Sequence, residues 1–482
     1  MSRIRKNNSF FILFLIIFTS FIFSGENIQA KEISLEEALN WGIENNSSIK
    51  EIKDSIETIE RSLNLIDTEY GFKTTISANP IIAGDFEEQT DDNSNGVDEG
   101  DTSFGSISSP KISLKTTKLF PNGIILQSEI FLKEEDLFDL EKLSEGPDSA
   151  FSATKNLYPV LPIKSEQEKY LASNNLLKAR ENLTWQQEYK KIEFLESYFN
   201  LIRLQERLSL AKINFQYAQE DLSKILKKIE IGEAGERQEI EAKIALKKAE
   251  IDFLQAQNTF LQQKNGWYLN LGLTEKTEVP LVEDSLFLEE IIKWAESLEF
   301  NLEEERLMEL AVDNYYKIRN ILLDQDSSQK EAEWNLAKNK TQVDLFGAYS
   351  SRNNSWGIGI ELSYDIFDGG KQKIEDEGYQ AELENLKEDY LQIVSELKLE
   401  LSDLINQQEI NNLNLEEKIM SWEKAKLEEE SYQIQLKQGF ISDSEFQYKT
   451  LGWQESEIDL KSAKDEILIN KLRIAHFLGI RK

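Results

Sequence analysis

The chain has 482 residues, with 55 lysines and arginines against 88 aspartates and glutamates, and its formal net charge is −33. This acidity excludes nucleic acid as a partner, because phosphate binding requires clustered lysine and arginine side chains. The sequence holds no cysteine and one histidine, so no disulfide, zinc site or catalytic triad is expected. It therefore predicts a protein that is not an enzyme and that needs no cofactor or metal.

Residues 1–30 have the order of a secretory signal peptide. Basic residues precede an apolar run at 10–23, and Ala30 closes the polar stretch that follows. A retained anchor is the alternative, although a spanning helix needs roughly 20 apolar residues. No later segment is apolar for that length, so an exported chain that spans a membrane must do so with strands.

The rest of the sequence is internally duplicated. A shift of 207 residues places Gly232 on Gly439 and the run 250–252 on the identical run 457–459. Each half begins with L-E-E-x-x-x-W and ends with L-G followed by leucine or isoleucine. Chance similarity between two Glu- and Leu-rich helices is the alternative. The pattern predicts two structural repeats, residues 31–273 and 274–482.

Each predicted repeat has the same order of elements. Apolar residues at spacings of three and four predict helices at 34–70 and 287–340. Proline-free stretches at 164–231 and 371–438 predict long helices, each about 100 Å at 1.5 Å per residue. A glycine-containing turn then returns the chain into a further helix. Helices of this length must pack side by side as in a coiled coil.

Strands separate the helices within each predicted repeat. From Trp356 to Ile366 apolar residues alternate with polar residues and glycine, as in a strand with lipid on one face and water on the other. A weaker alternation at 343–350 completes a hairpin, and the first repeat has a strand at 75–82 with a partner near 150–160. A half-buried sheet of a soluble protein would give the same alternation. The residues predicted to face lipid are Trp356, Ile358, Ile360, Leu362, Tyr364 and Ile366.

An insertion at 84–149 lies between the two first-repeat strands. It opens with an acidic, Gly- and Asn-containing run, which predicts a solvated loop. The spacing of a calcium-binding EF-hand is not met, which leaves weak Ca²⁺ binding as an alternative. The insertion also carries a hairpin of its own, with strands at 111–119 and 124–132 around Pro121-Asn122-Gly123.

Four short motifs resemble the TolC-type family of outer-membrane efflux proteins. They are S-L-E-E-A-L-N-W at 34–41, I-F-D-G-G at 366–370, K-Q-G-F-I-S at 437–442 and F-L-G-I at 477–480. The resemblance implies a mainly α-helical fold with a long coiled-coil barrel and a transmembrane β-barrel. A homotrimer would close that barrel with four strands from each protomer.

The resemblance also implies a location and partners. The strands would sit among outer-membrane lipid, and the helices would cross the periplasm. The channel would dock onto a periplasmic adaptor protein and an inner-membrane pump, as the exit duct of a tripartite efflux or type I secretion system. It would conduct exported solutes passively.

In this family the turns between the long helices form the periplasmic entrance and contact the adaptor. The corresponding residues are Gly232, Glu233, Ala234, Gly439, Phe440, Ile441 and Ser442. Phe440 is either an exposed apolar contact or a residue that packs its own turn. Glu445 would form a cation-selective ring in three copies. Some members carry a gate arginine where Ile441 stands, and the family's usual proline after the first helix is absent from 70–73.

Two other readings remain open from the sequence. A secreted or surface coiled-coil protein with a structural or adhesive role would share the signal peptide, the long helices and the acidity, but it does not explain the duplication. A periplasmic adaptor would have one helical hairpin, whereas this sequence predicts two. His476 lies beside Phe477 in the last helix and is expected to be a packing residue.

Overall fold

The computed structural model describes residues 31–79, 111–133, 147–273, 277–283, 285–300, 303–352 and 354–480. The predicted signal peptide at 1–30 and most of the predicted acidic loop lie outside the described residues. The chain forms two compact units. The first, here called the helical unit, holds the described residues of 1–53, 181–316 and 394–482. The second, the sheet unit, holds those of 54–180 and 317–393.

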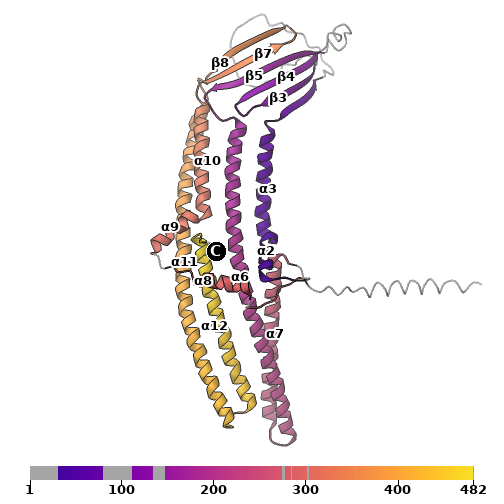
Figure 1. The fold of residues 1–482 in the computed structure, drawn as a ribbon, viewed down its shortest axis with the longest axis vertical. Helices are drawn as coiled ribbons and strands as arrows, with labels where there is room; N and C mark the ends of the chain where they lie inside the picture. The colour runs from indigo at the N-terminus through magenta and orange to yellow at the C-terminus, as the bar shows by residue number, and fades with distance from the viewer. Residues whose placement is uncertain are drawn as a thin grey trace, which may run out of the picture. The chain divides into compact units, whose positions relative to one another are not determined.

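The sheet unit contains a six-stranded antiparallel sheet in the order β2-β3-β4-β5-β7-β8. In the sheet, the hairpin of the insertion, β3 and β4, lies between β2, which precedes it in the chain, and β5, which follows it (Figure 1). The strands are β2 (Phe72–Asn79), β3 (Lys111–Leu119), β4 (Ile124–Lys133), β5 (Asp148–Tyr158), β7 (Gln342–Ser350) and β8 (Ser355–Ser363).

The number of strands in this sheet differs from the prediction. Four strands were expected from each protomer, and the sheet has six because the hairpin of β3 and β4 pairs on both sides. All eight residues of β2 have partners in β3, and β4 pairs with β5 along eight residues. The hairpin is thus part of the sheet, because its backbone groups satisfy those of both neighbours.

Helices adjoin one end of the sheet. Within the sheet unit, the last part of α3 (Ser47–Thr68), the start of α6 (Lys164–Glu230), α10 (Tyr316–Lys338) and the start of α11 (Lys371–Lys437) pack in that order. Lys169 bonds Asp67 at 2.7 Å between α6 and α3, and Asn174 donates to Ser327 at 2.9 Å between α6 and α10. The β3–β4 turn lies at this same end, because Gly123 approaches Ile163 just before α6.

The core of the helical unit is formed by α2 (Leu35–Asn45), α6, α7 (Glu236–Leu271), α8 (Leu286–Glu296) and α12 (Asp443–Phe477). Ser34 caps α2 as the S-x-x-E pattern predicts, because its hydroxyl accepts from the backbone of Glu37 at 3.2 Å and the Glu37 carboxylate accepts from the Ser34 backbone at 2.9 Å. The indole of Trp267 donates to the carbonyl of Phe194 at 3.1 Å. This bond lets the indole nitrogen of Trp267 enter the apolar core without losing a partner.

Two further features bear on the predictions. The stretch 287–340 forms three helices, α8, α9 (Glu304–Asn314) and α10, rather than one. The break between α9 and α10 falls at Tyr315, which has an extended backbone and a buried side chain. His476 packs on Trp185 with ring centroids 4.0 Å apart, so its predicted packing role is confirmed. Among the described helices none has the length and apolarity needed to cross a lipid bilayer.

Candidate functional site

The sheet has one apolar and one polar face. Residues paired across an antiparallel sheet point to the same side, so the register assigns every strand residue to a face. The line Phe72–Lys118–Leu126–Ala153–Gly347–Ile358 runs across all six strands on one side. The apolar face carries the exposed side chains of Phe72, Ile76, Ile112, Leu114, Leu126, Ile130, Phe151, Tyr349, Trp356, Ile358, Ile360 and Leu362.

The opposite face is mainly polar. Its hydrogen bonds join neighbouring strands: the hydroxyls of Ser77 and Ser113 lie 2.8 Å apart, and the Asn156 amide donates to Asp344 at 3.0 Å. This face carries the exposed apolar side chains of Ile125 and Phe346, and exposed Leu157 lies at the register shift of β5, without a partner residue in β7. An apolar face of this extent would normally be covered by helices or a second sheet in a soluble protein.

Aromatic residues mark both ends of the apolar face. Phe151, Tyr349 and Trp356 are directly opposite one another on three adjacent strands, and the first two rings are 6.4 Å apart. At the helix end, Lys118 lies 4.9 Å from the ring centre of Phe72 and 5.7 Å from that of Phe120.

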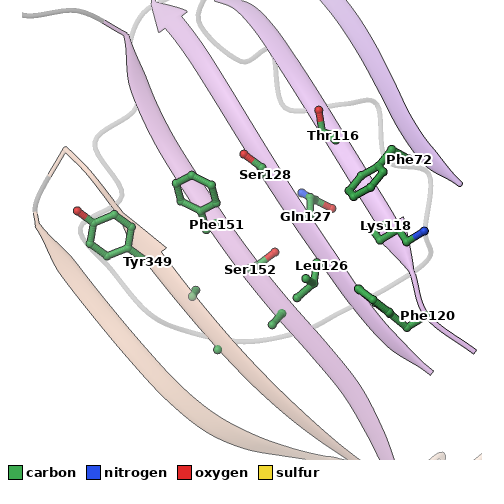
Figure 2. Close-up of a pocket in the computed structure, with 13 residues that line it drawn as sticks. Phe72, Thr116, Lys118, Phe120, Leu126, Gln127, Ser128, Phe151, Ser152 and Tyr349 are labelled. Carbon is green, nitrogen blue, oxygen red and sulfur yellow. The ribbon is translucent and has the colours of Figure 1, made fainter. Parts of the chain in front are cut away.

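Between these two rows the face is hollowed (Figure 2). The hollow has a volume of about 450 Å³, and Phe72, Phe120, Leu126, Phe151 and Tyr349 are among the residues that line it. Tyr158 also belongs to the row at the helix end, because a register shift after Asn156 pairs it with Val343 on the apolar face. Between the partners of Phe151 and Tyr158 the neighbouring strand advances six residues, about 20 Å at 3.3 Å per residue. At the strand tilt of about 35° to 45° found in barrels, this length spans about 14 to 16 Å along the barrel axis, which fits within the apolar band of about 25 Å that aromatic girdles flank on a membrane-spanning sheet.

The predicted lipid-facing residues fall partly outside the strand. Trp356, Ile358, Ile360 and Leu362 lie on the apolar face of β8, whereas β8 ends at Ser363, before Tyr364 and Ile366. The predicted strand was therefore too long by three residues. Asp368 explains where the chain turns, because its carboxylate accepts from the backbone of Gly370 at 2.9 Å and of Gln372 at 2.8 Å and so prepares the start of α11.

The two predicted turns lie in the helical unit, each between two long helices. Gly232 and Gly439 have φ of +79° and +74°, which favours glycine at both positions. In each turn the next residue's N–H bonds a carbonyl five residues back, Glu233 to Lys228 and Phe440 to Gln435. The side chain of Phe440 is 76% exposed. It does not pack its own turn, which removes one of the two expected roles.

The helices that flank the two turns contact each other. Lys224 near the end of α6 donates to the hydroxyl of Ser444 in α12 at 2.7 Å, and Tyr217 and Tyr448 meet edge to face at 6.2 Å. Ser442 caps α12 by accepting from the backbone of Glu445 at 3.2 Å, which fixes the first turn of that helix. Glu445 is exposed, next to the turn that carries Phe440.

A buried charge cluster also links α6 to α12. Arg203 of α6 is 8% exposed and bonds Asp465 of α12 at 2.8 Å and Glu206 at 2.9 Å, with Glu283 in contact as well. Lys461 bonds Glu206 at 2.7 Å. Burial raises the pKa of Asp465. Burial alone would also raise the pKa of Glu206, but the bonds from Lys461 and Arg203 outweigh it and lower that pKa.

Sequence reasoning missed this cluster and the incorporation of the hairpin. A signal for the cluster exists, because Arg203 follows the buried apolar residues Leu195 and Phe199 at intervals of four, on the same side of α6. Among the described residues no group of acidic or histidine side chains is arranged to hold a metal ion. The weak Ca²⁺ alternative concerned the acidic loop, which lies outside them.

Neither a protein-family model nor a curated protein matches the sequence. Solved structures do match the fold. The outer-membrane channel OprN is 14% identical with a TM-score of 0.61, and the match covers 93% of this chain and 90% of that one. The CmeC outer membrane channel of Campylobacter jejuni is 11% identical with a TM-score of 0.61, over 92% and 85%.

The MtrE outer membrane channel of Neisseria gonorrhoeae, in its open state, is 13% identical with a TM-score of 0.57, over 95% and 93%. At such identities the likeness concerns the fold. The predicted mainly α-helical fold with a sheet of strands is therefore confirmed, and so is the predicted resemblance to TolC-type channels, as a resemblance of folds.

Proposed function

We propose that this protein is an outer-membrane channel, the exit duct of an export system. The observation that carries the proposal is the sheet with one exposed apolar face, bounded at both ends by aromatic residues, and one polar face. Lipid is the environment that satisfies the apolar face, and water in a lumen satisfies the polar one. The likeness of the fold to three solved outer-membrane channels supports this proposal.

The duct is proposed to be a homotrimer. Within the described residues β2 pairs with β3 alone and β8 with β7 alone, so both edges of the sheet are open to another copy.

Two helices of the helical unit also carry stripes of exposed apolar residues that a second copy could cover. On α11 Leu413, Met420, Leu427 and Ile434 recur every seven residues and are exposed. On α7 Ile244, Ile251, Leu254 and Leu261 are exposed at similar spacing, so the two helices can pack between copies as a coiled coil.

The two turns are the proposed contact with a periplasmic adaptor protein, through which an inner-membrane pump delivers the cargo. Phe440 supports this role because an exposed aromatic ring at the tip of a helical hairpin can enter a pocket of a partner. The remaining residues of this contact are Gly232, Glu233, Ala234, Gly439, Ile441 and Ser442. Efflux and type I secretion are both compatible with such a docking tip.

Glu445 is proposed to form a ring of three carboxylates at the entrance. It is exposed beside the turn that holds Phe440, and acidic rings favour cations. The expected result is that Glu445→Ala lowers the cation-to-anion permeability ratio, measured as a reversal potential across a salt gradient. Glu455→Ala, an acidic residue in the same helix but away from the turn, is the matched control. Equal permeability ratios in wild type and Glu445→Ala would contradict the proposed ring of carboxylates.

The remaining parts of the proposal concern export and organisation. Residues 1–30 act as a cleaved signal peptide, and residues 31–273 and 274–482 are the two repeats of a duplicated channel. No catalytic step is proposed, since passive conduction needs none. A secreted adhesive stalk accounts less well for the sheet, because such a protein has no lipid to cover the apolar face.

Cell fractionation tests the proposed location and assembly. We expect the protein in the outer-membrane fraction, where detergent extraction gives trimers that dissociate to monomers on heating before electrophoresis. An Edman sequence beginning near residue 31 would identify the cleavage. Recovery of the protein from the culture medium or the soluble fraction, without detergent, would contradict the proposal and favour the adhesive stalk.

A further inference from the structure

The six-stranded sheet has a consequence for the size of the pore. We propose that β8 of one copy pairs with β2 of the next, so that three copies close an 18-stranded barrel with the polar face inside. This inference rests on the proposed trimeric channel, and it replaces the expected twelve strands by a wider barrel. The occupant of each open sheet edge is thus a second copy of this chain.

The directions of the edge strands suit this pairing. β2 starts at the helix end of the sheet, directly after α3, and β8 finishes at that end, before α11. Side by side, β2 and β8 therefore run antiparallel, like every other pair in the sheet. The number of strands supplied by each copy is even, as a wholly antiparallel barrel requires.

The register follows from the tilt of barrel strands. Register partners connect Lys73 through four strands to Gly357 on β8 of the same copy. Closure at a tilt of about 35° to 45° requires a shift of roughly six to eight residues for each six strands, given strands about 4.8 Å apart and 3.3 Å per residue. The shift must be even, because an odd shift would place apolar side chains on the polar face.

Only one direction of this shift leaves the strands in contact. In the other direction Gly357 would meet residue 67, which belongs to α3. In the permitted direction a shift of six residues aligns β8 with β2 along nearly their full lengths. It places Glu361 opposite Thr75 and Ser363 opposite Lys73 of the next copy, at a tilt of about 35°.

Both faces of the sheet continue across this junction. On the apolar face Ile360 would lie opposite Ile76, and Tyr364 opposite Phe72, which extends the aromatic row at the helix end. On the polar face Glu361 would lie diagonal to Lys73, so the two edges also carry opposite charges. The pairing thus leaves no apolar side chain in the lumen and no charge toward lipid at the junction.

The expected barrel is wide. Eighteen strands about 4.8 Å apart at a tilt of about 35° give a diameter of about 34 Å between opposite backbones, against about 22 Å for twelve strands. The outlet would therefore pass hydrated solutes about 12 Å wider than a twelve-stranded barrel admits. The cargo class that this favours is bulky and polar, such as unfolded polypeptide or oligosaccharide chains.

Pairs of introduced cysteines test the junction without interference from other thiols, because the chain has no native cysteine. Thr75→Cys combined with Glu361→Cys, oxidised in isolated outer membranes, should give disulfide-linked dimers and trimers on non-reducing gels. Lys73→Cys with Ser363→Cys is a second pair in the same register, should the first variant fail to assemble. Thr75→Cys with Leu362→Cys is the matched control, since those side chains lie on opposite faces and should not link.

A further pair tests the position of the hairpin within one copy. Ser77→Cys with Ser113→Cys should form an intramolecular disulfide, because those hydroxyls are 2.8 Å apart. Failure of that bond in membrane-embedded trimers would overturn the 18-stranded barrel and leave the proposed channel standing. A ladder that stops at the dimer, or linkage of the opposite-face control, would also overturn it. Absence of membrane trimers altogether would instead contradict the proposed function.

Discussion

The charge cluster around Arg203 gives a prediction whose size can be worked out. Arg203→Met removes a guanidinium that is 8% exposed and leaves Asp465, itself 19% exposed, without its main cation. Breaking a buried ion pair from one side costs about 3–5 kcal/mol. Because Lys461 still bonds Glu206, the lower end, about 3 kcal/mol, is expected here. The free energy needed to separate α6 from α12 should therefore fall by about 3 kcal/mol.

Hydrogen exchange followed by mass spectrometry measures this opening in the assembled protein. A loss of about 3 kcal/mol should accelerate the exchange of α12 amides near Asp465 by about 100-fold, at tenfold for each 1.4 kcal/mol. Arg207→Met is the matched control. Arg207 lies one turn further along α6 and bonds Asp459 at 2.6 Å, but it is 40% exposed, so its loss should cost about 1 kcal/mol or less. Equal acceleration in the two variants would refute the reasoning.

Three other predictions concern the two faces, the turns and pH. Ile360→Arg should cost about 2–4 kcal/mol at a lipid-facing position and abolish membrane trimers, as counted on gels without heating. Thr154→Arg, on the polar face of the central strand β5 and away from the proposed junction, should leave the trimers. Phe440→Ser should leave trimers intact but lower adaptor capture and efflux, whereas Gln438→Ser should not; normal capture by the serine variant would exclude Phe440. Glu206 has a lowered pKa, so the stability it supplies is fully present above about pH 4.3 and lost as pH falls through that lowered pKa. The urea midpoint should therefore fall less between about pH 5 and 3 in Glu206→Gln than in wild type, and parallel curves would contradict this.

Periodic and local signals in the sequence predicted most of the individual elements. The long helices were expected at 164–231 and 371–438 and lie at Lys164–Glu230 and Lys371–Lys437. The hairpin strands at 111–119 and 124–132 were also found, with β4 one residue longer. Helical periodicity and the Pro-Asn-Gly turn act over a few residues, so one sequence is enough to reveal them.

The features that escaped prediction depend on contacts between distant segments. Nothing local to β3 shows that its partners include Phe72–Asn79, since the alternation of a strand fixes its faces but not its neighbours. Arg203 meets Asp465, 262 residues away, and its partner could not be chosen among 88 acidic residues. The break at Tyr315 likewise reflects packing, because that ring leaves the helix to contact Trp185 and Phe477.

Ion conductance tests the proposed duct most directly. Purified trimers added to one side of a planar lipid bilayer should insert and give discrete single-channel current steps in salt solution. The steps should be absent when the protein is replaced by the Ile360→Arg variant, which cannot keep its apolar face in lipid. Trimers that enter the bilayer and carry no current would contradict the account, because a sheet with a polar inner face would then enclose no open path.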